Sequence, residues 1–122
     1  MTWKRASKRE MLTYGVIADG SLRAAFEKGE IKERYWNPGD MFDEVHVLTL
    51  ADDDIAPDHV QAMAGGGRLH IHAIGRPRPY NLLSLRQRAE ETFQRVRPDV
   101  IRGHGPFLQG YFAVHAAHRL GV

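Results

Sequence analysis

The sequence predicts an α/β domain: a Rossmann-like three-layer sandwich with a four-stranded parallel sheet and helices on both faces. Short apolar, partly β-branched runs alternate with helical segments, and turn residues separate them. Such alternation implies right-handed crossovers, and we expect the strand order 3-2-1-4. The length of 122 residues suits one domain. We expect it to span residues 11–122, after a flexible basic arm over residues 1–10.

The first half of the chain contributes two predicted strands. Residues 11–18 form the first, which is buried on both faces because the run is largely apolar. The turn Asp19-Gly20-Ser21 follows, and Ser21 can cap a helix that Gly29 ends. Residues 31–36 add a further turn, and residues 37–40 form a firm one. The second strand spans residues 42–50, and a short helix over residues 55–64 follows it.

The second half repeats this alternation. The third strand spans residues 68–74, and a stiff loop with two prolines ends it. Asn81 is expected to cap the next helix, which continues to Val96. Val100 and Ile101 belong to a short fourth strand with little access for solvent. The last helix is expected over residues 107–120.

Composition excludes several classes of protein. Charged residues are 26% and hydrophobic residues 43% of the chain, as in ordinary globular proteins. The pI of about 9.2 reflects four basic residues within the arm, so we expect no nucleic-acid face. The chain has no cysteine, which excludes disulfides and thiolate metal sites. No apolar run approaches a membrane span and no secretory signal is present, so the expected location is cytoplasmic.

The stretch over residues 97–110 predicts the functional site. It combines a helix end, a short strand, the glycine-flanked His104 and a new helix beginning near Pro106. Gly103 and Gly105 allow a sharp turn or a close approach to a ligand. In the order 3-2-1-4 the first and fourth strands are neighbours where the order reverses. A ligand crevice is therefore expected between residues 18–21 and residues 102–107.

These residues resemble a known family. The string Arg97-Pro98-Asp99-Val100-Ile101-Arg102-Gly103-His104-Gly105-Pro106, with Gly110 and residues 116–122, is similar to the amino-terminal domain of family-4-type (GT-B) glycosyltransferases. Residues 35–39 and 42–47 also resemble a bacterial branch of that family. The resemblance spans most of residues 11–122. It implies two Rossmann-like domains facing across a cleft, and metal-independent sugar transfer with retention at the anomeric carbon.

The resemblance also implies roles for particular residues. His104 matches the histidine that such enzymes place near the transferred sugar, and it is the candidate catalytic residue. Asp19 and Gly20 match the family's loop after the first strand, and we expect them to bind substrate together with Ser21, Gly103 and Gly105. Arg102 departs from the family pattern, in which a histidine is common there. The first loop also lacks the family's usual pair of glycines.

The sequence has no donor domain with paired glutamates and phosphate-binding cations. We therefore expect a truncated or split acceptor-side domain, inactive without a donor-binding domain, with nucleotide sugar and acceptor as partners only in a complete enzyme. A partner chain could carry the donor domain. The alternative is a non-catalytic binding or assembly domain that forms a homo-oligomer through its open sheet edge. We expect no cofactor and no metal.

Four other features admit a functional interpretation. His70 and His72 share one face of a strand like a metal pair, and His46 could reach them, but histidines covered by a helix are the preferred interpretation. Asp52-Asp53-Asp54 is interpreted as a charge cluster at a helix start. Gly65-Gly66-Gly67 precedes a strand and is therefore no phosphate cradle. Tyr35 and Trp36, near a turn, are candidates for a surface contact.

Overall fold

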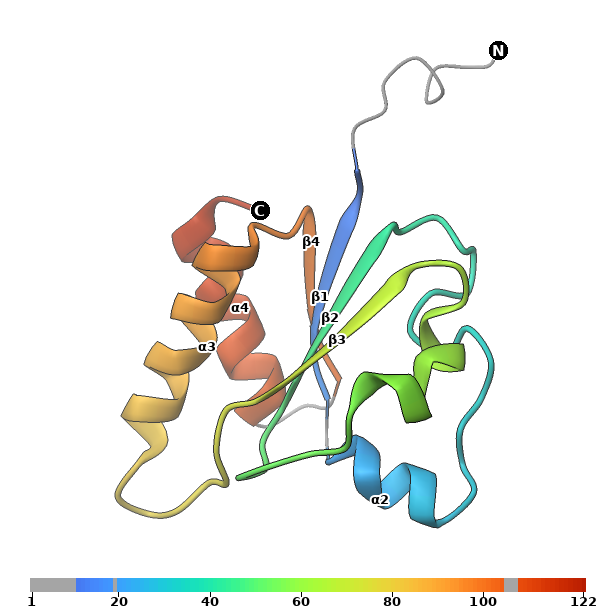
Figure 1. The fold of residues 1–122 in the computed structure, drawn as a ribbon. Helices are drawn as coiled ribbons and strands as arrows, with labels where there is room; N and C mark the ends of the chain where they lie inside the picture. Colours follow the sequence, from blue (N-terminus) through green and yellow to red (C-terminus); the bar gives the residue numbers. More distant parts are fainter. Residues whose placement is uncertain (1–10, 19, 105–107) are drawn as a thin grey trace.

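The computed structural model describes residues 11–18, 20–104 and 108–122. The predicted basic arm, residues 1–10, lies outside this part of the chain. The sheet has the order β3-β2-β1-β4, and each neighbouring pair is parallel (Figure 1). This confirms the predicted α/β sandwich and its strand order. The strands are β1 (Thr13–Ile17), β2 (Glu44–Thr49), β3 (Arg68–Ala73) and β4 (Val100–Gly103).

Helices cover both faces of the sheet, but the two layers differ in regularity. One layer is made by α3 (Leu82–Val96) and α4 (Leu108–Leu120). The other contains α2 (Leu22–Glu27), two 3-10 helices, η1 (Pro57–His59) and η2 (Gln61–Ala64), and irregular chain (Figure 1). No helix in the described ranges has both the length and the apolar character to cross a bilayer.

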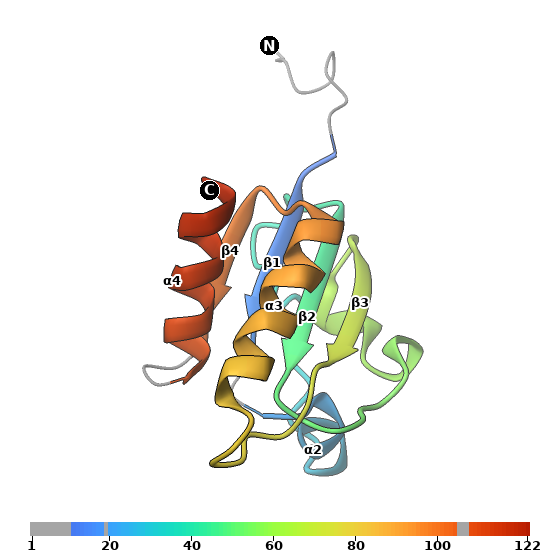
Figure 2. The ribbon, with the colours of Figure 1, turned by 90° about the vertical axis from the view of Figure 1, so that its left-hand side faces the viewer.

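Helices α3 and α4 cover one face of the sheet (Figure 2), and the first hydrophobic core lies beneath them. Phe93 is fully buried and lies against β1 where Gly15 leaves room for it. A Cβ atom at Gly15 would lie 2.7 Å from Phe93 Cε1, so the glycine is required by packing. The buried members of this first core are Ile17, Leu48, Ile74, Leu85, Ala89, Phe93, Phe112, Ala113 and Ala116.

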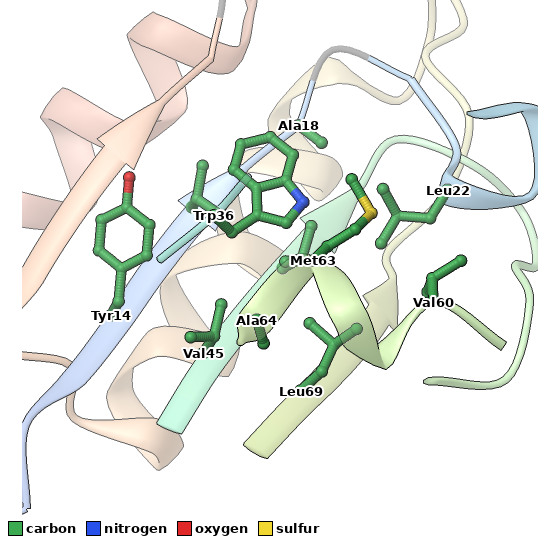
Figure 3. Close-up of a cluster of buried hydrophobic side chains, with 11 residues drawn as sticks. Tyr14, Ala18, Leu22, Trp36, Val45, Val60, Met63, Ala64 and Leu69 are labelled. Atoms are coloured by element: carbon green, nitrogen blue, oxygen red, sulfur yellow. The ribbon is translucent and has the colours of Figure 1, made fainter. Parts of the chain in front are cut away.

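The opposite face holds the second core, under α2 and the 3-10 helices (Figure 3). Trp36 and Met63 extend this core toward the carboxyl ends of the strands. Its buried members are Tyr14, Val16, Ala18, Leu22, Trp36, Val45, Val47, Val60, Met63, Ala64 and Leu69.

The turn over residues 37–40 is fastened from inside by Asn37, which is fully buried. Its Nδ2 donates to the carbonyls of Phe42 at 3.0 Å and Ala64 at 2.9 Å, and its Oδ1 accepts from the Phe42 N–H at 3.2 Å. The amide therefore joins the turn to η2 and to the chain entering β2. The predicted firm turn is present, and its strength comes from this buried side chain.

The predicted helix over residues 55–64 is wrong. The chain forms η1 and η2, which meet at Val60 with φ −130° and ψ 20°, outside the helical region. Pro57 begins η1, and Gly65 ends η2 with φ +58°. Val60, Met63 and Ala64 still reach the core, because two short 3-10 turns also bring them toward the sheet.

Two further local predictions need correction. Val100 is 45% exposed, because β4 lies at the edge of the described sheet and pairs with β1 alone. Asn81 precedes α3 but makes no side-chain cap. Its Oδ1 instead accepts from Arg78 N at 2.7 Å, and its Nδ2 donates to the Arg76 carbonyl at 3.0 Å, so it stabilises the preceding loop. By contrast, Ser21 does cap α2, accepting from Ala24 N at 3.1 Å.

Candidate functional site

The carboxyl ends of β1 and β4 form the floor of the candidate site. The two strands pair in parallel up to Ile17 and Gly103. One further hydrogen bond, from His104 N to the Ile17 carbonyl at 2.8 Å, continues this pairing. His104 is thereby held at the edge of the sheet, beside the turn that leads to α2. The described parts of the two predicted turns, up to His104 in one and around Gly20 and Ser21 in the other, are therefore neighbours as predicted.

A pocket of about 370 Å³ opens at this edge. Its size falls within the range usual for small-molecule sites. Apolar residues form its base, and hydroxyl, imidazole and charged groups line the remainder. It is lined by Ala18, Gly20, Ser21, Leu22, Ala25, Glu30, Lys32, Tyr35, Trp36, Met63 and His104.

His104 is oriented by two aromatic residues of the irregular layer. Its Nε2 lies 3.2 Å from Tyr35 Oη, at hydrogen-bond distance. The Trp36 ring meets the imidazole edge to face, with ring centroids 5.2 Å apart. Tyr35 and Trp36 also meet edge to face, at 4.7 Å. The three rings therefore support one another, and the orientation of His104 does not depend on its loop alone.

Tyr35 and Trp36, which form one wall of the pocket beside His104, differ in their exposure to solvent. Tyr35 is 40% exposed, as a surface contact requires, whereas Trp36 is only 5% exposed. Figure 3 shows Trp36 beside Ala18 and Met63 in the core cluster. The prediction of surface exposure is therefore wrong for Trp36, because its indole closes the core under the pocket.

The other predicted site residues divide into three groups. Gly20 and Ser21 line the pocket with His104. Gly103 does not line it: a Cβ atom there would lie 2.4 Å from the Gln109 carbonyl oxygen, so this glycine lets α4 begin close to β4. Asp19 and Gly105 lie outside the described residues. Sequence reasoning did not find Glu30, Lys32 or Met63, because they come from segments with no motif and reach the pocket only through the fold.

The acidic triplet acts at a helix start, but the helix is not the one that follows it. Asp54 accepts from Leu22 N at 3.0 Å and from Arg23 N at 2.7 Å, and so satisfies the first N–H groups of α2 from across the sheet edge. Asp53 forms a 3.1 Å ion pair with Arg23. A hydrogen bond from Arg78 lowers the pKa of Asp52. The triplet thus fixes the start of α2, which lines the pocket, and it also holds the proline-rich loop.

A second polar cluster lies on the other face of the sheet, in the layer of α3 and α4. Register places His46 beside His70, and Glu44 and His72 share their face. The His46 and His70 rings stack with centroids 4.1 Å apart, His46 Nδ1 lies 2.9 Å from His72 Nε2, and His70 Nε2 lies 2.5 Å from Glu44 Oε1. The structure therefore brings all three strand histidines together and adds a carboxylate that the sequence did not indicate.

Burial alters the protonation of this cluster. The pKa of His46 is lowered to about 4, first by burial and then by repulsion from His70 and His72. The pKa of His72 is lowered by burial, then by His70 and by Arg95 of α3. At neutral pH these two imidazoles are uncharged, and each then carries one nitrogen lone pair.

Comparison of the chain with protein-family models, curated proteins and solved structures gives no match.

Proposed function

We propose that this chain is the acceptor-side domain of a retaining glycosyltransferase that uses a nucleotide sugar. The observation that carries the proposal is the pocket between the carboxyl ends of β1 and β4, with the His104 imidazole in its wall. Ligands of open α/β sheets bind at such a reversal of strand order. The resemblance of residues 97–106 to the glycosyltransferase family adds the expected ligand, a sugar.

The polar groups of the pocket suit a sugar. A sugar hydroxyl both donates and accepts, and so does the pair formed by Tyr35 Oη and His104 Nε2, in which either partner can be the donor. Ser21 also lines the pocket and offers a hydroxyl, and Lys32 and Glu30 offer charged groups. In the proposed role His104 bonds a hydroxyl of the transferred sugar and stabilises charge as the donor bond breaks.

The charges of the pocket also suggest what it does not bind by itself. Lys32 is the single cation among the described lining residues, and the first N–H groups of α2 are already bonded to Asp54, whereas a diphosphate normally needs several cations or a free helix N-terminus. The diphosphate of the donor would therefore be held by a donor-binding domain, on the same polypeptide or on a partner chain. In this proposal the pocket binds only the sugar, and the other domain binds the diphosphate.

Binding is tested by titrating the ¹⁵N-labelled chain with monosaccharides and with UDP-, GDP- and ADP-sugars. We expect weak binding, with amide shifts near Ser21, Tyr35 and His104. His104→Ala should remove these shifts, whereas His118→Ala, an exposed substitution on α4, should preserve them. If no sugar or nucleotide sugar perturbs these amides, or if His104→Ala responds like the unsubstituted chain, the proposal is wrong.

Activity is tested with the donor-binding domain supplied, in cis or in trans. We expect release of nucleotide from one class of nucleotide sugar when an acceptor is present, and a loss of at least about 100-fold for His104→Ala. Absence of nucleotide release from every nucleotide sugar would remove the enzymatic part of the proposal.

A second candidate function is assembly through the open edge of β4. Val100 on β4 is 45% exposed and Val114 on α4 is 70% exposed, and in the described sheet β4 pairs with β1 alone. An unpaired edge with apolar neighbours favours association. Light scattering over a concentration series should then show an oligomer that Val100→Lys disrupts. A monomer at all concentrations would count against this function.

A further inference from the structure

The cluster on β2 and β3 has the composition of a transition-metal site. Glu44, His46 and His70 each offer one ligand atom, and these three atoms lie within 4.8 Å of one another. Imidazole nitrogens with one carboxylate oxygen are donors that Zn²⁺ and its neighbours in the first transition row prefer. We propose that Glu44, His46 and His70 bind one Zn²⁺-class divalent cation, with His72 positioning His46. The proposal does not depend on the sugar pocket.

The spacing of the three donors is close to what zinc requires. Three points no more than 4.8 Å apart share a centre within about 2.8 Å of each, whereas zinc–ligand distances are about 2.1 Å. The three donor atoms are therefore within about 0.7 Å of a common zinc–ligand distance. His70 Nε2 and Glu44 Oε1, which are 2.5 Å apart, must also separate by about 0.9 Å to become two tetrahedral ligands. Side-chain rotation can supply such a movement without a change of the strands.

Two hydrogen bonds within the cluster orient the ligand atoms before a metal binds. His70 Nε2 and Glu44 Oε1 lie at a hydrogen-bond distance of 2.5 Å, and a cation between them would replace this hydrogen bond. His46 Nδ1 bonds His72 Nε2 at 2.9 Å. When His46 Nδ1–H is the donor, its Nε2 keeps the lone pair for the metal. Metal-binding histidines commonly use their second nitrogen in this way.

The rings must turn toward each other for the cation to bind. The His46 and His70 planes are parallel within 6°, so their nitrogen lone pairs lie in two parallel planes and do not converge on one point. Binding would open this stack and turn both lone pairs toward one point. The His70 side chain is 33% exposed and that of Glu44 is 18% exposed, which gives a cation access from solvent. The fourth tetrahedral position would be left for water.

The surrounding charges permit a cation. Glu44 compensates part of the cation's charge, and imidazole ligands bind a metal in their neutral form, so they add no positive charge. Arg95 and Glu91 on α3 border the cleft beside His72, and both are exposed to solvent. The repulsion from Arg95 is therefore screened and partly balanced. The site would fasten β2 to β3 near the start of both strands.

The test is calorimetric titration of the untagged chain with ZnCl₂ after treatment with a chelator. The proposed cluster is one site, and residues 1–10 add no further histidine ligand because they contain none. The expected stoichiometry is therefore one Zn²⁺ per chain. His46→Ala, His70→Ala and Glu44→Gln should each weaken binding at least tenfold. His72→Ala should weaken it about 10- to 100-fold through the loss of positioning. The matched control His118→Ala should bind within twofold of the unsubstituted chain.

Two results would overturn the proposal. One is binding to the unsubstituted chain that is no tighter than to a His46→Ala/His70→Ala double variant. The other is an equal loss of affinity in His118→Ala, which would indicate scattered surface binding.

A second measurement needs no variant and decides the matter if the substituted chains do not fold. In the unsubstituted chain, Zn²⁺ should shift the imidazole ¹⁵N resonances of His46 and His70, and it should change their ring-proton shifts as the stack opens. Co²⁺ should give the visible absorption of a tetrahedral site. Zn²⁺-dependent shifts confined to His59, His104 or His118 would contradict the assignment.

Discussion

The two histidine sites of this domain lie on opposite faces of one sheet and are built in opposite ways. His104 follows the last residue of β4 and is held by Tyr35 and Trp36, which come from an irregular segment about 70 residues earlier. His46 and His70 lie within paired strands, and strand register alone makes them neighbours. The first site depends on the loops around it, whereas the second depends on the sheet.

This difference indicates which changes should affect one site and leave the other intact. A loop-built site can be loosened by a substitution that the sheet tolerates. A strand-built site should persist as long as β2 and β3 remain paired, because their ladder positions its side chains. The following predictions test this separation.

The largest effect is expected for Asn37→Ala. The substitution leaves the Phe42 N–H and the carbonyls of Phe42 and Ala64 without this partner in a buried place. We expect a loss of about 2–4 kcal/mol in the free energy of unfolding, measured by urea denaturation. The Tyr35–Trp36 wall should loosen as well. Asn81→Ala, at a partly exposed amide, is the control and should cost less than half as much.

Gly103→Ala should come next. Its Cβ atom would lie 2.4 Å from the Gln109 carbonyl oxygen and 2.7 Å from Gly110 Cα, so the start of α4 must shift. We expect a loss of about 1–3 kcal/mol and weaker sugar binding, with unchanged Zn²⁺ binding at Glu44, His46 and His70.

The matched control for this prediction is Gly20→Ala, because a Cβ atom there would meet no atom of the described residues within 4 Å. The stability of that variant should stay within about 0.5 kcal/mol of the unsubstituted chain. Equal destabilisation by both substitutions would contradict the packing argument. Loss of Zn²⁺ binding in folded Gly103→Ala would show that the two sites are coupled.

A pH effect is expected from the strand-built site in the metal-free chain. The pKa of His46 is lowered to about 4 in the folded state, whereas an unfolded histidine titrates near 6.5. Between these values the unfolded chain binds the proton more strongly, so stability should fall as the pH falls from about 6.5 toward 4. His72, whose pKa is also lowered, acts in the same direction.

Denaturation at several pH values measures this effect. His46→Gln should flatten the dependence over that window, and His118→Ala should leave it unchanged. If the slope of stability against pH is the same in His46→Gln as in the unsubstituted chain, His46 is not its source.

Tyr35→Phe should have the smallest effect on stability. It removes the hydroxyl that lies 3.2 Å from His104 Nε2 at a partly exposed position. We expect a change in the free energy of unfolding below about 0.5 kcal/mol and a severalfold loss of sugar affinity. An unchanged affinity would show that this hydroxyl does not orient His104 for a ligand.

Sequence reasoning predicted features that depend on local pattern and on the rules of strand connection. The order β3-β2-β1-β4 and the neighbourhood of His104 and Ser21 follow from alternation and the handedness of crossovers. The common face of His70 and His72 follows from the two-residue period of a strand.

The features that were missed depend on contacts between distant segments. Asp54 was assigned to the helix after it, because sequence order does not show that α2 lies within reach. Trp36 was placed at the surface, because a turn residue is usually exposed, but its indole packs in the core cluster with Ala18 and Met63. Glu44 joined the histidines only when the β2–β3 register was known.

The hydrogen bonds of the Asp54 carboxylate limit the order in which parts of the chain can fold during synthesis. Helix α2 has six residues, too few to persist alone in water. Two of its first N–H groups depend on a side chain that is 32 positions later for Leu22 and 31 for Arg23. During synthesis on a ribosome, α2 and the part of the pocket that it lines would therefore stay unformed until β2 and the acidic triplet had emerged from the exit tunnel.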